Sequence, residues 1–375
     1  MKKKILIFHN TIAPYRIKFF NQLSEKFDAK ICLYYENLKD QKFNYDNIRR
    51  QFDFCPDYLD GHIKVLSREI YTGHVKRIKK YRPDIVIVPE YGEALWCAVL
   101  LKIIMGYQYK IVTICDDSLD YAVNCKGMRK KSRQMAVKFL DGIILCNDEA
   151  KQWYDQHYDV NTFTFPIIQD ECDYRSNIDN IIANAEKIRI EYNLTGKRVF
   201  LYVGRIAPEK NLEYLVASFI ECHKKHPENM LLIVGGAIES CRQYLDEIQN
   251  IIHSNHAADY IKCVGRKEGD ELKSWYAVGQ IFVLPSKLEP FGTVVNEALI
   301  MGEYVMVSKH AGSCCLVDRE NGEIIDIDCK NIDFTKVSEE VPVLGERIQK
   351  RDSKMKLHFD ERMEECVKWI EWLDK

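Results

Sequence analysis

The sequence predicts an α/β protein built from two Rossmann-like domains, each with a doubly wound parallel sheet. The 375-residue chain is longer than a single hydrophobic core usually supports. Short apolar runs alternate with amphipathic helical stretches, a pattern typical of parallel strands covered on both faces, and this pattern occurs twice. The expected strands are residues 4–8, 29–35, 84–89, 110–115 and 142–146 in the first half, and 198–204, 230–236, 260–265, 280–286 and 303–308 in the second.

The break between the two domains is expected within residues 165–196, where hydrophobic periodicity is lost before a polar helix and a Thr-Gly turn. We therefore assign residues 1–170 to the first domain and residues 171–357 to the second. The last segment, 358–375, is predicted to be an amphipathic helix that packs back on the first domain. Its apolar stripe comprises Phe359, Met363, Cys366, Val367, Ile370 and Leu373.

Composition indicates a globular protein, with 46% hydrophobic and 29% charged residues. The formal net charge of −2 argues against general nucleic-acid binding. The 14 cysteines are scattered without a C-x-x-C pair, which predicts no zinc site and favours a reduced, cytoplasmic compartment. The apolar run Ile5 to Phe8 is too short for a signal peptide, and residues 94–107 are too short to span a bilayer.

The first unusual strand-to-helix turn lies within residues 198–225. The strand ends at Gly204, the following loop carries Arg205 and Lys210, and Asn211 is a plausible N-cap for the next helix. Two cations beside a helix N-terminus favour an anion such as a diphosphate, because the unpaired N–H groups and the dipole add to both charges. The alternative is an exposed loop with ordinary solvated charges.

The second unusual turn follows the strand 280–286. Gly292 lets the backbone approach a ligand, and Thr293 can cap a helix that places Glu297 one turn from its start. Carboxylates accept hydrogen bonds from pairs of sugar hydroxyls, so Glu289 and Glu297 could hold two hydroxyl-bearing parts of one ligand. The alternatives are a solvated loop residue for Glu289 and a glutamate favoured by the helix dipole for Glu297.

Four segments of the second half carry a family resemblance: "VGRIAPEKNLEYL", "IVGG", "VGRKEGDELKSWYAVGQIFVLPSKLEPFGTVVNEALIMGEYVMVS" and "AGSCCLVDRENG". In order and spacing they resemble the donor-binding half of the retaining glycosyltransferases of family four, most densely from Val199 to Gly322. The resemblance implies the GT-B fold, in which two Rossmann-like domains face a central cleft. The N-terminal domain would then bind the acceptor and the C-terminal domain the nucleotide-sugar donor.

The resemblance also implies roles for individual residues. Arg205 and Lys210 resemble the pair that neutralises the diphosphate leaving group, and Glu289 resembles the ligand of the sugar hydroxyls; we take these three as catalytic. Glu297 resembles the carboxylate that accepts from the ribose hydroxyls. The other expected donor-binding residues are Gly204, the loop Phe291, Gly292 and Thr293, and Arg266 where the family's loop passes the base.

The implied reaction moves a sugar from a nucleotide-diphosphate sugar to an acceptor hydroxyl with retention of configuration. In this family the departing phosphate takes the acceptor's proton, so no glycosidase-like carboxylate pair is required. We expect no metal or other cofactor, because the arginine and lysine replace a divalent ion. The sequence "DID" at residues 326–328 mimics a metal motif of another glycosyltransferase fold, but we interpret it as a strand end.

The N-terminal half offers weaker candidates. In "HNTIAPYRIKFFNQL", Pro14 is expected at the first helical position, and "PYR" resembles a subset of the family that builds bacterial surface polysaccharides. His9 and Arg16 are candidate contacts to acceptor or donor; the alternative is a loop histidine and a solvated arginine. Asp116 or Asp117 could orient the acceptor hydroxyl, with turn capping as the alternative.

Two cysteines depart from the family pattern. Cys115 stands where many relatives have histidine, and Cys315 stands where the "GG-x-x-E" segment often has glutamate, so neither contact can be carried over. These departures keep open a sugar-nucleotide-binding scaffold that has lost catalysis. A sugar-nucleotide epimerase of the same fold is a further alternative, and it would need no second substrate.

The segment "CKGMRKKSRQMAVKFL" has six basic residues from Lys126 to Lys138, with apolar residues at helical spacing. Such a helix could rest on an anionic membrane that carries a lipid-linked acceptor. The alternative is a core-packed helix with a solvated basic face. The expected partners are a nucleotide-sugar donor and a carbohydrate or lipid-linked acceptor, in the synthesis of a surface polysaccharide or glycolipid.

Overall fold

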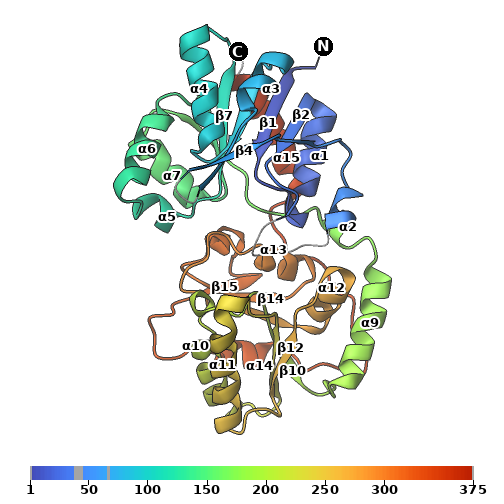
Figure 1. The fold of residues 1–375 in the computed structure, drawn as a ribbon. Helices are drawn as coiled ribbons and strands as arrows, with labels where there is room; N and C mark the ends of the chain where they lie inside the picture. Colours follow the sequence, from blue (N-terminus) through green and yellow to red (C-terminus); the bar gives the residue numbers. More distant parts are fainter. Residues whose placement is uncertain (1, 38–44, 66–67, 374–375) are drawn as a thin grey trace. The chain divides into compact units, whose positions relative to one another are not determined.

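The computed structural model describes residues 2–37, 45–65 and 68–373, and the chain folds into two compact units (Figure 1). Unit 1 comprises Met1–Ile167 together with Phe359–Lys375, and unit 2 comprises Ile168–His358. The chain therefore leaves the first unit close to the boundary expected at residue 170. It returns to that unit with its last helix.

Unit 1 is built on a seven-stranded sheet in which every neighbouring pair is parallel, in the order β3-β2-β1-β6-β7-β8-β9. Ile7 of the central strand is paired with Ile31 on one side and Ile87 on the other. The strands are β1 (Lys4–His9), β2 (Asp28–Leu33), β3 (Asp57–Tyr58), β6 (Ile85–Pro89), β7 (Lys110–Cys115), β8 (Gly142–Leu145) and β9 (Asn161–Thr164).

A separate antiparallel hairpin, β4 (His62–Val65) with β5 (Arg68–Tyr71), was not expected from the sequence, and neither were the short strands β3 and β9. The helices of unit 1 are η1 (Pro14–Arg16), α1 (Ile17–Lys26), α2 (Tyr45–Arg49), α3 (His74–Tyr81), α4 (Glu93–Met105), α5 (Leu119–Val123), α6 (Gly127–Val137), α7 (Asp148–His157) and α15 (Phe359–Leu373). Among the described residues, no helix has the length and apolar character needed to span a bilayer.

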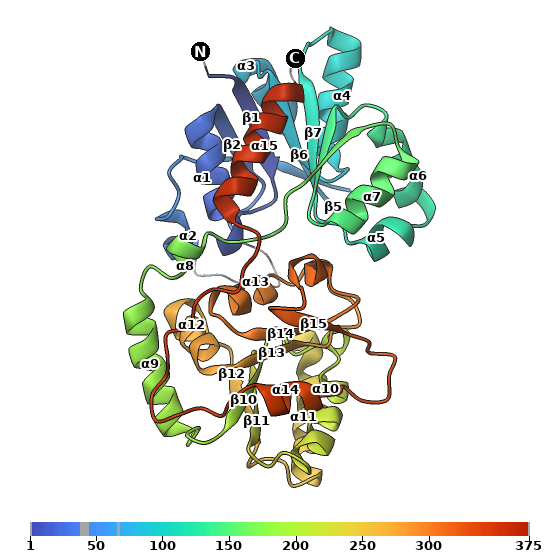
Figure 2. The same ribbon diagram turned by 180° about the vertical axis from the view of Figure 1, so that it is seen from behind.

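The C-terminal helix α15 packs on unit 1, beside α1 (Figure 2). Phe359 contacts Phe165 edge to face, and Arg362 donates a hydrogen bond to the carbonyl of Thr164. Because the buried residues recur at helical spacing, one face of α15 is covered and the other is solvated. The buried stripe comprises Phe359, Met363, Cys366, Ile370 and Leu373.

Unit 2 has a six-stranded parallel sheet in the order β12-β11-β10-β13-β14-β15. Its strands are β10 (Arg198–Val203), β11 (Asn229–Val234), β12 (Ile261–Gly265), β13 (Ile281–Leu284), β14 (Tyr304–Ser308) and β15 (Gly322–Ile325). Its helices are α8 (Glu171–Tyr174), α9 (Ile178–Glu191), η2 (Pro208–Lys210), α10 (Leu212–His223), η3 (Glu239–Cys241), α11 (Arg242–Ser254), α12 (Gly269–Val278), α13 (Thr293–Ile300), η4 (Gly312–Leu316) and α14 (Thr335–Glu340).

The predicted fold class of two doubly wound parallel sheets is confirmed, because helices cover both faces of each sheet as the apolar strands require. Every residue of β10, β11 and β13 is buried. In both sheets the strand order reverses at one point, between β1 and β6 in unit 1 and between β10 and β13 in unit 2. Ligands of doubly wound proteins bind beyond the carboxyl ends of the strands at such a point.

Candidate functional site

The switch point of unit 2 brings the two predicted turns together. The N–H of Lys287 in the loop after β13 donates to the carbonyl of Glu209 in the loop after β10, at 2.9 Å. Lys210 and Glu289 form a salt bridge across the same two loops, with side chains only 10% and 12% exposed. Two residues predicted separately as a phosphate ligand and a sugar ligand are therefore direct neighbours.

Arg205 lies nearer the surface than Lys210. Its guanidinium is 3.4 Å from the Glu209 carboxylate, and its carbonyl accepts a 2.8 Å hydrogen bond from the buried hydroxyl of Tyr202. The loop after β10 lies directly against the loop after β11. A Cβ atom added to Gly235 would be 1.8 Å from the carbonyl oxygen of Gly204. Glycine at position 235 is thus required for the two loop backbones to meet.

The N-terminus of α10 differs from the prediction. Asn211 adopts a left-handed conformation with φ of 60° and makes no side-chain cap. The hydroxyl of Tyr244 instead accepts hydrogen bonds from the N–H groups of Leu212, at 2.9 Å, and Glu213, at 3.4 Å. The expectation that unpaired N–H groups of this helix would hold an anion was wrong for these two amides, and the local positive charge comes from the side chains.

The turn before α13 is held by hydrogen bonds to the segment around η4. The N–H of Gly312 donates to the carbonyl of Glu289 at 3.1 Å, and the N–H of Ser313 donates to the carbonyl of Phe291 at 2.7 Å. Gly292, with φ of 90°, occupies the N-cap position, and the helix begins at Thr293. Thr293 is therefore the first helical residue rather than the cap. Glycine suits the cap position because it adopts this left-handed geometry without strain.

Glu297 is fixed by two hydrogen bonds from other elements. Its Oε1 accepts from the Gln169 amide at 3.0 Å and its Oε2 from the Tyr276 hydroxyl at 2.9 Å. Burial raises the pKa of Glu297, and the two hydrogen bonds oppose that rise. Gln169 and Tyr276 were not predicted from the sequence. Gln169 lies at the junction of the two units and Tyr276 on the buried side of α12, and no local sequence pattern connects either residue to Glu297.

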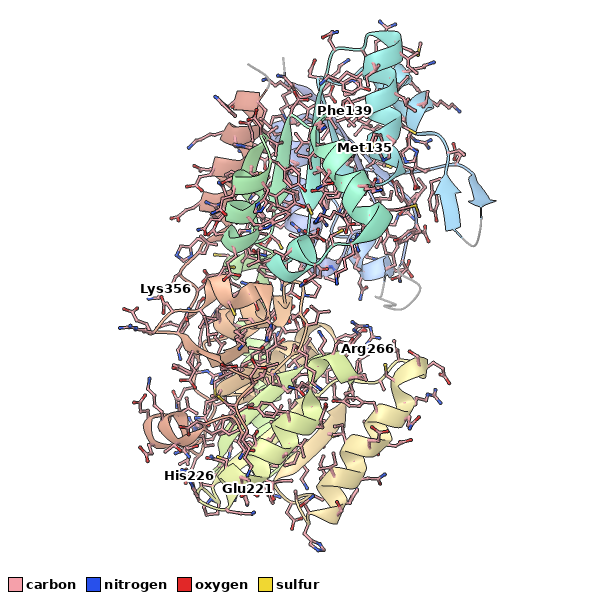
Figure 3. The ribbon with its side chains drawn as sticks, turned by 90° about the vertical axis from the view of Figure 1, so that its left-hand side faces the viewer. Met135, Phe139, Glu221, His226, Arg266 and Lys356 are labelled. Carbon is pink, nitrogen blue, oxygen red and sulfur yellow. The ribbon has the colours of Figure 1, made fainter. Side chains whose placement is uncertain are left out.

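Two buried hydroxyls also lie at this edge of the sheet and were not predicted. Within the described parts of the chain, the Oγ atoms of Ser286 and Ser313 have no hydrogen-bond partner. The Ser313 Oγ would be 3.1 Å from a Cβ placed on Gly292, so it directly adjoins the turn. Arg266 lies on the loop after β12, exposed and paired with Glu268, and its Cβ is 3.6 Å from a Cβ placed on Gly236 (Figure 3).

In unit 1, two of the weak candidates lie together at the switch point. The Nδ1 of His9 is 2.9 Å from the carbonyl of Thr11, and burial lowers the pKa of His9 to about 4, so the ring is neutral at pH 7. Arg16 is buried at the carboxyl edge, and its guanidinium is 2.5 Å from the carboxylate of Asp116. The alternative of a solvated arginine is therefore wrong, since Arg16 is 4% exposed.

The neighbouring acids divide into a buried one and an accessible one. Asp117 is buried and paired with Arg133, which is also buried, so it acts in a structural ion pair. The side chain of Asp116 is 43% exposed. Cys115 lies below this edge, with its sulfur buried 4.0 Å from the hydroxyl of Tyr154, and burial raises its thiol pKa.

Glu90 is a further acid at this switch point that the sequence analysis missed. It follows β6 directly with a left-handed φ of 47°, and the Thr113 hydroxyl donates to its carbonyl at 2.6 Å. Burial, followed by the charge of Asp117, raises its carboxyl pKa, although the side chain is still 53% exposed. An acidic residue immediately after an expected strand was the signal that could have identified it.

Two other predicted features are the "DID" segment after β15 and Cys315 on η4, the 3-10 helix that bonds to the turn before α13. Asp326 and Asp328 follow β15 and both pair with Lys309, at 2.7 and 2.6 Å. Cys315 is exposed on η4. The "DID" segment is therefore the expected strand end, held to the next loop by a lysine.

Comparison with known proteins places these features in a family context. Residues 184–336 match the family model described as glycosyl transferases group 1. An uncharacterized glycosyltransferase of Methanocaldococcus jannaschii, MJ1607, is 31% identical over 124 residues, which are 33% of this chain and 30% of the relative. The alignment therefore spans less than a third of that relative.

Solved structures match over a much larger share of the chain. A glycosyltransferase from Rickettsia africae superposes with a TM-score of 0.73 at 16% identity, covering 100% of this chain and 99% of the other. HepE from Anabaena in complex with UDP-glucose gives a TM-score of 0.64 at 16% identity, covering 90% and 88%. The chain thus has the GT-B fold, and its residues 184–336 match the glycosyl transferases group 1 family model.

Proposed function

We propose that this protein is a retaining glycosyltransferase of family four, which transfers a sugar from a nucleotide-diphosphate sugar to an acceptor hydroxyl. The observation that carries the proposal is the salt bridge of Lys210 with Glu289 beside Arg205, at the switch point of a group 1 domain. Cations and a sugar-binding carboxylate side by side suit a ligand in which a diphosphate is joined to a sugar.

The leaving diphosphate would be neutralised by Arg205 and Lys210. A lysine ammonium has three donors, and Glu289 takes one of them, so donors remain for phosphate oxygens. Arg205, 39% exposed and paired only at 3.4 Å with Glu209, can turn toward the diphosphate at little cost. Because this positive charge acts where negative charge develops in the transition state, we propose a reaction without a metal ion.

The nucleoside end of the donor would be held by Glu297. Its carboxylate is pre-oriented by Tyr276 and Gln169, and each oxygen keeps an acceptor site for a ribose hydroxyl. The backbone amides of Phe291, Gly292 and Thr293 would contact the sugar and the phosphates. Arg266 would lie beside the base. HepE, of the same fold, was crystallised with UDP-glucose, which supports a nucleotide-sugar donor here.

The acceptor would bind at the switch point of unit 1, with Asp116 and Glu90 oriented toward its hydroxyls and His9 and Arg16 behind them. We propose a carbohydrate or lipid-linked acceptor in the cytoplasmic synthesis of a surface polysaccharide or glycolipid. Because the proton goes to the departing phosphate in a front-face mechanism, these groups would position the acceptor rather than deprotonate it. The scattered positions of the 14 cysteines in the sequence support a reducing compartment.

A thermal-shift screen of the purified protein against UDP, GDP, ADP, CMP and their sugar conjugates tests the proposal. A ligand that binds only the native state raises the melting temperature, so one nucleotide family should do so and Glu297→Ala should abolish the effect. Nucleotide release with extract lipids would then support transfer. Binding without release would instead favour a scaffold, and conversion of the donor without acceptor would favour an epimerase. The absence of any shift would contradict a donor site in this unit.

A further inference from the structure

The carboxyl-terminal half of α4 presents large apolar side chains to solvent. Leu100, Ile103 and Ile104 follow i, i+3, i+4 spacing on one face, and Met105 ends the helix; all four are more than half exposed, and Ile104 is 73% exposed. The opposite face, which includes Leu95, Ala98 and Val99, is buried in the unit 1 core. The helix is thus apolar on both its packed and its open side, unlike an ordinary surface helix.

The neighbouring helix α6 continues the apolar surface. Met128 and Met135 lie one heptad apart on one face, with Met128 87% exposed, and Phe139 follows just after the end of the helix. Arg133, Ala136 and Val137 lie on the buried face, so α6 is packed on the core and its basic face is exposed, as the alternative interpretation expected. The two methionines, however, lie outside the packed face. The exposed residues are not needed to fill the core, because their neighbours already do so.

The two helices form one continuous surface. The ring of Phe139 is 6.4 Å from that of Trp96 in α4, and Lys102 of α4 reaches Asp141 just beyond α6, at 3.0 Å. Figure 3 shows Met135 and Phe139 on the side of the unit where α4 lies. We call this the α4–α6 surface; its apolar members are Leu100, Ile103, Ile104, Met105, Met128, Met135 and Phe139.

The charge around this surface is predominantly positive, although Asp141 pairs with Lys102 and Glu90 lies 3.7 Å from Arg129. The sequence contains no aspartate or glutamate from residue 94 to residue 115 or from residue 122 to residue 140. The chain as a whole has a formal net charge of −2, so the positive charge is a local concentration. The exposed basic residues are Lys126, Arg129, Lys130, Lys131 and Lys138.

We propose that the α4–α6 surface docks on the headgroup region of an anionic lipid bilayer. The isoleucines and methionines would enter the interface between headgroups and acyl chains, and the lysines would contact lipid phosphates. Peripheral binding to a membrane requires two signals, apolar groups and basic groups, and this surface combines them. A protein partner of ordinary composition would not need such an excess of positive charge. This inference does not depend on the donor-site assignments.

Vesicle sedimentation with the full chain tests the inference. Binding is expected to phosphatidylcholine vesicles containing about one third phosphatidylglycerol, and at least about tenfold weaker to pure phosphatidylcholine, because each lysine near an anionic surface contributes about fivefold. Ile103→Ser with Ile104→Ser should weaken binding about tenfold or more by removing inserted apolar area. Lys130→Glu with Lys131→Glu should do the same through charge, and raised salt should mimic it.

The matched control is Ile190→Ser with Lys187→Glu on α9 of unit 2, where an exposed isoleucine, 65% accessible, also lies beside an exposed lysine. This control should bind vesicles like the unmodified protein. Equal losses in the control and in the surface variants would overturn the proposal, and so would no binding to anionic vesicles. Light scattering tests whether a second protein chain covers the surface instead. A dimer of the unmodified protein that becomes a monomer in the Ile103→Ser, Ile104→Ser variant would show this and would overturn the proposal.

Discussion

The ammonium group of Lys210 donates a hydrogen bond to Oε2 of Glu289, a residue 79 positions later in the chain. The contact joins the loops on either side of the switch point of unit 2, and both side chains are nearly excluded from solvent. A buried ion pair is costly to desolvate, so it contributes less to stability than its short contact suggests. Its position at the ligand-binding edge indicates a role in function instead.

Lys210→Ala should lower sugar transfer by about 10²-fold or more, because the change removes a donor that we propose to contact the leaving group. The same change should cost several kcal/mol of stability, about 3–5 at most, because Glu289 is left unpaired in a site of low exposure. Steady-state kinetics and urea unfolding measure the two effects. An unchanged turnover would remove Lys210 from the catalytic set.

The double variant Lys210→Met with Glu289→Leu separates the two contributions. Replacing both partners by apolar groups of similar size should recover most of the lost stability, since no charge is then left unpaired. Transfer activity should stay as low as in the single variant. If activity returned together with stability, the pair would be structural and the leaving-group assignment would fail.

Glu297→Ala and Glu289→Ala should affect different parts of the donor. Loss of Glu297 should weaken the free nucleotide and the nucleotide sugar alike, because both carry the ribose. Loss of Glu289 should weaken only the ligand that carries the sugar. Calorimetric titration with both ligands measures this division, and equal effects of the two variants on both ligands would contradict it.

The positions of the main strands could be predicted because buried parallel strands leave unbroken apolar runs, as in residues 85–88 and 281–284. The short strands β3 and β9 and the hairpin β4–β5 could not, because two to four residues carry no periodicity. The same limit applied to the site. Turn residues such as Lys210 and Glu289 follow predicted strands, whereas Tyr276 reaches Glu297 from the buried side of a helix.

Arg16 illustrates a second limit. A charged residue in a first helical turn is usually solvated, and no local pattern shows that a partner from the loop after β7 will cover it. The structure buries it against Asp116, 100 residues away. Glu90 follows an expected strand directly, which was a usable signal, but its left-handed backbone conformation is unusual for glutamate and could not be predicted.

Glu90→Gln should lower transfer to the acceptor about tenfold or more, if this acid orients an acceptor hydroxyl at the switch point of unit 1. The substitution keeps the size of the side chain but removes a charged acceptor. Nucleotide binding should not change, because Glu90 lies in unit 1 and the donor turns lie in unit 2. Kinetics at varied acceptor concentration and the nucleotide thermal shift give the two readouts, with Glu149→Gln on the exposed face of α7 as control. A loss of nucleotide binding would contradict the assignment.

Glu303 should make the stability of unit 2 fall as pH rises. Its side chain is fully buried at the start of β14, and neither oxygen has a hydrogen-bond partner among the described residues. Burial raises its pKa well above the ordinary value, while Arg351 and Lys354 partly oppose this rise. The folded state therefore keeps its proton at pH values where the unfolded chain, with a pKa of about 4.3, has lost it.

The stabilising contribution of protonated Glu303 is thus fully present below the unfolded pKa and is lost as pH rises toward the folded pKa. Glu303→Gln removes this titration with little change in shape, so its free energy of unfolding should decline less between pH 5 and pH 8 than that of the unmodified protein. Urea unfolding at a series of pH values measures the difference, with the exposed Glu339→Gln as control. Parallel pH profiles for Glu303→Gln and the unmodified protein would mean that Glu303 is ionised in the fold. Its charge would then have to be compensated by Arg351 and Lys354.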